Sequence, residues 1–295
     1  MDVYQNEGDV KNKELLSIIS NIGCGISFVC LVLTVIVHVY FKSLWKLMSS
    51  KILVNLSISL AATYLTFLVG FQAYSTKITA VCKAAAAVLH YFLLTSFMWM
   101  SVEALHIYLG LFVFKTIRSS FIKRSSILVW GLPAVIVTIT LATNHTNNYS
   151  VTEQVCWLSN TAFYAAFLAP AVIILLFNLI MFSFVMRRLK AMQNDEQVEH
   201  KTNKVRVFGI VGLCFLLGFC WILAFFAFHE AAEVFKYLFA IFNTLQGMFI
   251  FICYCIYKKD TRDVIYPCVC KRKARKLGKV PKNMKNSNSE HEINV

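Results

Sequence analysis

Charged residues are scarce in this chain. Asp, Glu, Lys and Arg together make up 15% of the 295 residues, whereas about a quarter is typical of a soluble globular domain. Hydrophobic residues make up 58%, and they occur in long runs. These features exclude an ordinary soluble domain, and the absence of ten-residue segments of alternating polarity excludes a transmembrane β-barrel.

Seven apolar runs are long enough to cross a bilayer, whose hydrocarbon core of about 30 Å takes roughly 20 helical residues. The runs are apolar nearly all round, whereas a soluble helix bundle would need polar outer faces. The sequence therefore predicts an all-α membrane protein, a seven-transmembrane helix bundle. The predicted spans are Leu15–Tyr40, Ile52–Phe71, Cys82–Phe114, Ser126–Thr143, Ala162–Met186, Val207–Phe228 and Val234–Tyr257.

The positive charge is gathered on one side of the predicted bundle. Of the 29 Lys and Arg, 24 fall in the first, third and fifth loops and in the tail. The positive-inside rule places the N-terminus outside and the C-terminus in the cytoplasm, and the net charge of +14 then gives no reason to expect nucleic acid as a partner. We expect an extracellular N-terminus over 1–14, a transmembrane domain over 15–257, and a cytoplasmic tail over 258–295 with a helix on the membrane surface.

Loop residues predict three kinds of covalent modification. The loop between spans four and five holds no Lys or Arg and carries glycosylation sequons at Asn144 and Asn148. Only two of the ten cysteines lie at the predicted outer surface, which is oxidising, so we expect a disulfide between Cys82 and Cys156. In the basic tail, Cys268 and Cys270 are candidates for palmitoylation, and two cysteines are too few for a zinc site.

Glu103 is the only acidic residue inside the seven predicted spans. A carboxylate at the bilayer centre costs about 2.5–3.5 kcal/mol on insertion scales and is usually retained for a function. With His106 it forms Glu-x-x-His on one helix face, but a di-metal site would need a second copy and two more carboxylates. Transporters and pumps show several mid-membrane ionisable groups or paired broken helices, and neither is visible. No metal site is therefore expected.

The remaining interpretation of Glu103 is a polar contact between helices. It lies twelve residues before Lys115, roughly 18 Å along a helix, which places it in the inner half of the bundle. There it must be protonated or hydrogen-bonded to other helices, and the candidate partners are Asn55, Ser57 and Gln246. Such a contact, worth about 0.6 kcal/mol on average, holds one of two helix arrangements and still allows switching. A static packing network remains the alternative.

Several stretches resemble the adhesion G-protein-coupled receptors. "WMSVEALHIYL" resembles their third helix, with His106 and Tyr108 in a His-Leu-Tyr-type triplet, and "LLGFCWILAFFAF" resembles their sixth, with a switch tryptophan at Trp221. "YLFAIFNTLQGMFIFICYC" is similar to their seventh helix, and most similar to the G subfamily. The rhodopsin-like motifs Asp-Arg-Tyr and Asn-Pro-x-x-Tyr are absent.

The resemblance implies a receptor of the plasma membrane that is not an enzyme and uses no cofactor. A peptide, small-molecule or lipid ligand would enter the outer half of the bundle, span six would swing outward, and a heterotrimeric G protein would dock at the inner face. The implied ligand-site residues are Leu89, Leu93, Trp157, Trp221 and Asn243. The implied residues of the polar switch and G-protein surface are Glu103, His106, Tyr108, Phe114, Gln246 and Gly247.

The residues before the first span depart from the family pattern. Family members carry a large extracellular region with an autoproteolysis domain and a tethered apolar agonist peptide, and "MDVYQNEGDVKNKELLSIIS" contains no such peptide. Two interpretations stay open: a fragment or short isoform of a longer receptor, or activation by a separate ligand or basal activity. A non-signalling partner of full-length receptors and a membrane transporter or enzyme remain as alternatives.

Overall fold

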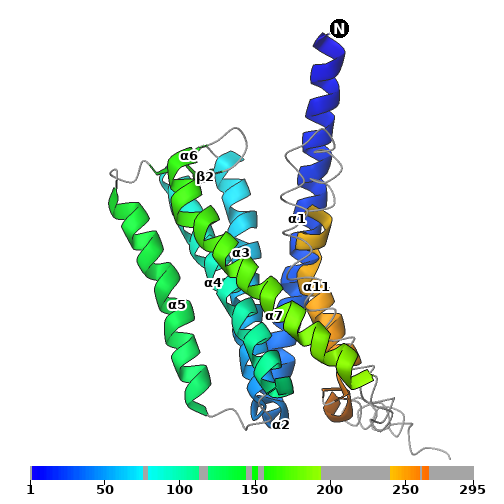
Figure 1. The fold of residues 1–295 in the computed structure, drawn as a ribbon. Helices are drawn as coiled ribbons and strands as arrows, with labels where there is room; N and C mark the ends of the chain where they lie inside the picture. The colour runs from blue at the N-terminus through cyan, green and yellow to red at the C-terminus, as the bar shows by residue number, and fades with distance from the viewer. Residues whose placement is uncertain are drawn as a thin grey trace, which may run out of the picture.

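The computed structural model describes residues 2–75, 79–112, 119–143, 148–151, 156–193, 240–259 and 261–265. This part of the chain is almost entirely helical (Figure 1). The long helices are α1 (Asp2–Tyr40), α3 (Met48–Ser75), α4 (Thr79–Phe112), α5 (Ser119–Ala142) and α7 (Ala169–Gln193). The short elements are α2 (Lys42–Trp45), β1 (Tyr149–Val151), β2 (Cys156–Leu158), α6 (Asn160–Ala162), the π-helix η2 (Phe163–Leu168), α11 (Gln246–Phe251) and the π-helix η4 (Ile252–Tyr257).

Five helices in the described residues are long and apolar enough to cross a membrane. They coincide with the predicted spans one to five, and the shorter apolar helix Gln246–Tyr257 forms part of the predicted span seven. The predicted span six, Val207–Phe228, lies outside the described residues. The chain is thus a membrane protein with several spans, and the sidedness of its termini stays a prediction.

Helix ends differ from the predicted ends because hydrophobicity does not stop a helix. α1 begins at Asp2 rather than Leu15, and in Figure 1 its N-terminal part projects beyond the ends of the other helices. An established helix adds each further residue at little cost, and no proline interrupts residues 2–14. At the other end, residues 261–265 are helical, where the sequence predicts a surface helix.

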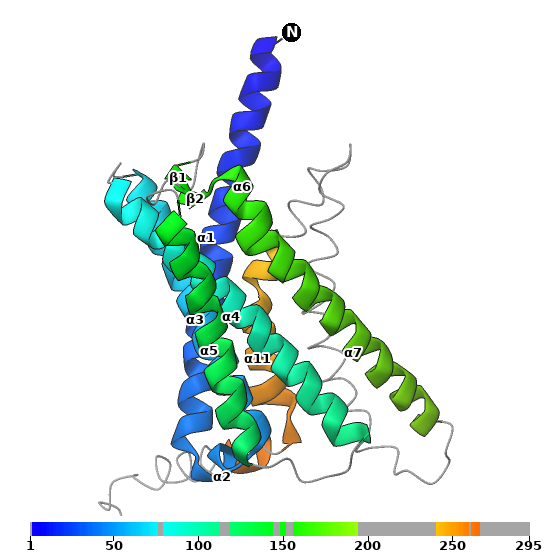
Figure 2. The same cartoon turned by 60° about the vertical axis from the view of Figure 1, so that its left-hand side comes forward.

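Helix α4, which forms the third span, is the centre of the described bundle. α4 packs against α3, α5 and α7, while α1 packs against α3 and α11, an arrangement that Figures 1 and 2 both show. Trp99 of α4 is fully buried, and its ring lies edge-on to that of Trp130 at 6.3 Å. Large apolar side chains such as Ile127 and Ile173 stay exposed on the outside, as expected of helices surrounded by lipid.

Two glycines bring the first and seventh spans into close contact. A Cβ on Gly247 would lie 2.8 Å from the Cβ of Ser27 and 2.9 Å from Cδ1 of Leu31, and a Cβ on Gly23 would overlap the side chain of Thr244. Small residues at a membrane helix interface let two backbones approach in this way. Neither glycine has room for a side chain.

Ser27 forms hydrogen bonds with backbone groups at a break in the seventh span. The helix is interrupted at Leu245, so the N–H of Met248 does not bond the carbonyl of Thr244, its usual α-helical acceptor. The Ser27 hydroxyl donates to that carbonyl and accepts from the N–H of Met248 at 3.4 Å. Because lipid offers no substitute partners, one serine of α1 satisfies both backbone groups of the break.

A Gly247→Ala substitution should destabilise the bundle. Its Cβ must displace Ser27 and Leu31, and overpacking of this kind costs about 1–3 kcal/mol. The matched control is Gly25→Ala, because a Cβ on Gly25 meets no atom within 4 Å. Thermal unfolding of the detergent-purified protein should show a lower Tm for Gly247→Ala and no change for the control. Equal melting temperatures would contradict the close-packing argument.

Candidate functional site

A buried hydrogen bond joins the third and seventh spans. Glu103 of α4 is 2% exposed, and its Oε1 accepts a hydrogen bond from the hydroxyl of Tyr254 in η4 at 3.0 Å. The other carboxyl oxygen, Oε2, has no partner among the described residues. We call the Glu103–Tyr254 bond the inner latch. The carboxyl group is therefore used between helices rather than within one.

Lys258 extends the inner latch to the second span. Its Nζ donates to Oγ of Ser49 at 3.1 Å and lies 5.4 Å from the centroid of the Tyr254 ring, within the range of a cation–π contact. Tyr254 thus lies between a carboxyl group and an ammonium group, and the cluster connects spans two, three and seven.

None of the three partners predicted for Glu103 bonds it in the structure. Asn55 donates to the carbonyl of Lys51 at 2.8 Å and accepts from Nε1 of Trp130 at 3.3 Å. Nε2 of Gln246 lies 4.0 Å from Sδ of Met100. Oγ of Ser57 has no partner among the described residues. The prediction of an interhelical hydrogen bond is confirmed, but the predicted partners are wrong.

The sequence does hold a signal for Tyr254. Gln246, Ile250 and Tyr254 recur at a spacing of four, which places them on one helix face, and all three are buried. A tyrosine on the buried face of a membrane helix needs a partner for its hydroxyl. Lys258 is the first cation after the seventh span, and this position likewise indicates a contact with polar groups at this end of the bundle.

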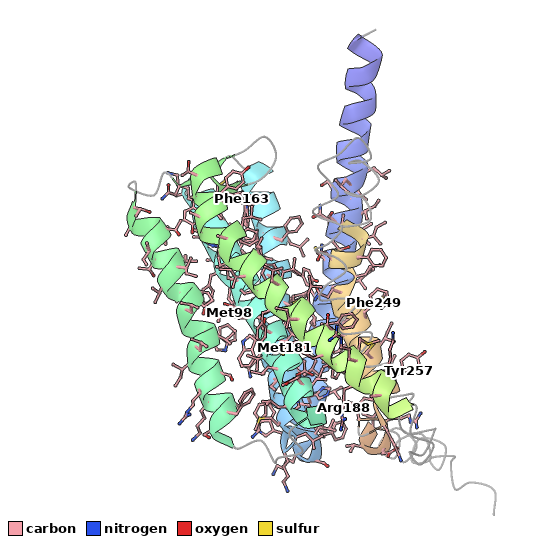
Figure 3. The ribbon with its side chains drawn as sticks, viewed as in Figure 1. Met98, Phe163, Met181, Arg188, Phe249 and Tyr257 are labelled. Atoms are coloured by element: carbon pink, nitrogen blue, oxygen red, sulfur yellow. The ribbon has the colours of Figure 1, made fainter. Side chains whose placement is uncertain are left out.

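The other predicted switch residues lie near the inner latch or outside the described residues. Nδ1 of His106 is buried with no hydrogen-bond partner in the described part of the chain. The ring of Tyr108 lies 6.0 Å from that of Phe184 in α7, so it joins spans three and five. Figure 3 places Arg188 and Tyr257 at this same end of the bundle. Phe114 lies outside the described residues.

A second buried polar cluster lies at the opposite end of α4. Nε2 of His90 bonds the carbonyl of Ala166 at 3.1 Å, and Nδ1 lies 3.0 Å from the hydroxyl of Tyr149. A carbonyl only accepts, so Nε2 carries the proton and Nδ1 accepts from the phenol. Burial raises the pKa of the Tyr149 hydroxyl to about 12, so it remains a donor at physiological pH. We call this set the outer latch.

The outer latch depends on a proline in the fifth span. In an α-helix the carbonyl of Ala166 would accept from the N–H of residue 170, and Pro170 has no N–H. The helix takes a π-helical turn at this point, η2, where Ala169 donates to the carbonyl of Tyr164. Nε2 of His90 replaces the missing donor at Ala166. Pro170 thus creates the acceptor that fixes α4 to the fifth span.

The outer latch also holds the loop hairpin. β1 and β2 pair antiparallel, with Tyr149 opposite Leu158 and Val151 opposite Cys156, and both strands pack against α4. Cys82 of α4 is disulfide-bonded, and its pairing with Cys156 stays a prediction. Because Tyr149 is fully buried, the hairpin is fastened to the bundle by a side chain as well.

The structure describes four of the five implied ligand-site residues. Leu89 and Leu93 of α4 are half-buried, and the ring of Trp157 packs edge-on against that of Phe167 at 5.3 Å. The carbonyl of Asn243 accepts from the hydroxyl of Tyr64 at 2.7 Å. Trp221 lies outside the described residues. Their contact with a ligand stays a prediction.

The side chain of Asn148 caps the end of α5. Nδ2 donates to the carbonyls of Thr140 and Thr143 at 2.9 and 3.1 Å, and to Oγ1 of Thr143 at 2.9 Å. These are carbonyls that a helix end leaves without intrahelical donors. Glycosylation of Asn148 would replace one hydrogen of this capping nitrogen, and Asn144 lies outside the described residues. Use of either sequon stays a prediction, as does palmitoylation of Cys268 and Cys270, which also lie outside the described residues.

A metal site finds no support in the described part of the chain, where no group of three or more His, Cys, Asp and Glu is placed to hold an ion. The two polar clusters instead consist of hydrogen bonds between spans. Each of these bonds joins elements that are far apart in the sequence.

Comparison with known proteins agrees with this architecture. Residues 13–250 match the family model of the seven-transmembrane receptors of the secretin family. The chain is 38% identical over 271 residues to the human adhesion G-protein coupled receptor G4 and 39% identical over 274 residues to human receptor G2. It is 37% identical over 283 residues to receptor G6 of Danio rerio. These alignments cover 89%, 88% and 90% of this chain, but only 9%, 27% and 24% of the relatives.

The outer latch predicts a coupling between two substitutions. Tyr149→Phe leaves Nδ1 of His90 without its donor, and His90→Phe leaves the Tyr149 hydroxyl and the Ala166 carbonyl without partners. Each buried group left unsatisfied costs about 1–3 kcal/mol, so each variant should lower the Tm of the purified protein. Because both remove one shared bond, the double variant should lose less than the sum. The control is Tyr164→Phe, whose ring is exposed, and additive losses would contradict a direct bond.

A second double-mutant cycle tests the predicted disulfide. Cys82→Ser and Cys156→Ser should lower surface expression to the same extent, and the double variant should be no worse than either single one. Flow cytometry of tagged protein on intact cells measures the surface level. A double variant whose loss equals the sum of the two single losses would refute the pairing.

Proposed function

Because the chain belongs to the secretin family of seven-transmembrane receptors, and within it to the adhesion receptors of the G subfamily, we propose that it transmits a ligand signal to a heterotrimeric G protein. The chain spans between a tenth and about a quarter of the length of the relatives that it matches. The proposal therefore concerns the transmembrane domain, acting at the plasma membrane with its N-terminus outside.

The inner latch is the observation that carries the proposal. Glu103 and Tyr254 come from spans three and seven, and the positive-inside rule assigns their end of the bundle to the cytoplasm. In the proposed resting state the bond, with Lys258 beside it, keeps these spans together. Outward movement of span six in the active state breaks the contact and opens a cavity, lined by His106, Tyr108 and Phe114, in which the G protein docks.

The strength of the inner latch suits a reversible switch. Interhelical hydrogen bonds in membranes average about 0.6 kcal/mol and reach about 1.7 kcal/mol. A ligand that binds one arrangement more tightly by a comparable free energy changes the populations of the two states. In this proposal Glu103 holds two spans together and performs no chemistry on a substrate; the relatives are named as receptors.

The ligand is proposed to bind in the outer half of the bundle. The loop hairpin lies at this end of the bundle, where the outer latch fastens it to α4. Leu89, Leu93 and Trp157 provide the apolar surface, Asn243 provides a polar group, and Trp221 reports occupancy to span six. A peptide, small molecule or lipid fits such a site.

Breaking the inner latch should raise basal signalling. Tyr254→Phe removes the hydroxyl and Glu103→Leu removes the acceptor, and a loss of about 0.6 kcal/mol shifts a two-state equilibrium about threefold. Glu103→Gln keeps an acceptor and should stay close to the unaltered chain. The readout is second-messenger output in transfected cells at matched surface expression.

The controls separate the inner latch from general damage. Tyr40→Phe removes a hydroxyl from an exposed tyrosine of α1 and should leave output unchanged. The double variant Tyr254→Phe with Glu103→Leu should signal no more than either single variant, because one bond is lost in all three. Unchanged output in both single variants would exclude the switch. No output from the unaltered chain with any G protein, alone or with added agonist peptides, would favour a non-signalling partner of full-length receptors.

A further inference from the structure

A groove of about 460 Å³ lies between the fourth and fifth spans. Ile136 and Ile139 of α5 form one wall, and Ala162, Ala165 and Ala166 of α6 and η2 form the other. Its volume is in the range of small-molecule sites. Figures 1 and 2 show α5 and α7 close together at the loop end and diverging toward the other end.

The groove faces the surroundings of the bundle. Ile139 is 58% exposed and Ala165 is exposed, and both belong to segments that are apolar enough to span a membrane. The medium in contact with the groove is therefore lipid. From Ile136 to Thr143, the lining covers two turns of α5, roughly 10 Å at 1.5 Å per residue, a length that suits a rigid fused-ring skeleton.

The polar atoms of the groove lie at its loop end and are mostly acceptors. The Thr140 hydroxyl donates its hydrogen to the carbonyl of Ile136, so its oxygen can only accept. Asn148 uses Nδ2 to cap α5, and its Oδ1 has no hydrogen-bond partner within the described ranges. Thr161 lines the same end. The described residues that line the groove include no charged side chain.

This pattern selects among membrane lipids. Phospholipid head groups are charged and their ester oxygens only accept, so they match neither the uncharged lining nor its acceptors. A sterol presents one uncharged hydroxyl that can donate, at the end of a flat apolar body. We propose that the groove between α5 and η2 binds a membrane sterol, with the sterol hydroxyl at Thr140, Asn148 and Thr161 and its ring system along the three alanines.

The groove follows from the same local structure as the outer latch. Ala162, Ala165 and Ala166 follow the i, i+3, i+4 spacing that places side chains on one helix face, and all three line the groove beside the π-helical turn η2. The carbonyl of Ala166 is held from the inner side by His90, while the side chain of Ala166 lines the groove. The site is thus built on a fixed backbone and does not depend on the proposed signalling function.

The test is photo-crosslinking in phosphatidylcholine vesicles that contain the full-length chain and a diazirine analogue of cholesterol. Peptide mapping should place the label on the outer turns of α5 or on α6 and η2. Ala165→Phe fills the groove and should reduce this labelling to background. The matched control is Ala134→Phe, because Ala134 is an exposed alanine of α5 that does not line the groove, and it should leave the labelling unchanged. Equal labelling of the two variants would overturn the proposal.

Two further measurements test recognition of the hydroxyl. Unlabelled cholesterol should compete with the probe more strongly than cholest-4-en-3-one, whose ketone cannot donate, by about two- to tenfold for one hydrogen bond. Thr161→Val, a conservative change at an exposed position, should reduce labelling by a similar factor. Equal competition by the ketone would contradict the proposal. Labelling by a photoreactive phosphatidylcholine that cholesterol does not displace would identify an acyl chain instead, and cross-linked pairs of chains would identify a second copy.

Discussion

Inside a bilayer a polar group has no water to bind, so each one must find its partner within the protein. This constraint accounts for the positions at which the described spans are joined. Glu103 is paired with Tyr254, His90 with Tyr149 and Ala166, and Ser27 with both sides of the break before Met248. In a soluble protein water could satisfy several of these groups; here each group joins two spans.

These three contacts between helices (the inner latch, the outer latch and the Ser27 contact) differ in the groups that they satisfy. Ser27 bonds backbone groups that the break in the seventh span leaves without helical partners, and the outer latch does the same for the carbonyl that Pro170 leaves free. Removal of either contact would therefore leave a backbone group without a hydrogen-bond partner in lipid. The inner latch joins two side chains that belong to intact helical turns, and Oε2 of Glu103 stays without a partner among the described residues. In the proposed mechanism it is the contact that opens, and it lies at the end where the proposed G protein docks.

Much of the architecture could be predicted before any coordinates existed. Helix length in a membrane is set by bilayer thickness, so apolar runs gave spans one to five to within a few residues, apart from the N-terminal extension of α1. The importance of Glu103 was also predictable, because a lone carboxyl group among seven spans requires an explanation on energetic grounds. Its partner was missed because Asn55, Ser57 and Gln246 are all plausible donors, and sequence spacing does not tell which helix faces α4.

Composition and periodicity therefore determined the class of protein, its spans and the residue on which a switch would depend, since these follow from the solvent that surrounds the chain. The tertiary structure decided which polar groups meet: Tyr254 rather than Gln246, and His90 at the carbonyl that Pro170 leaves free. It also decided that three alanines and three threonines, from segments far apart in the sequence, would line one groove. Such pairings depend on the rotation and register of helices against one another, and these are fixed only when all the side chains pack together.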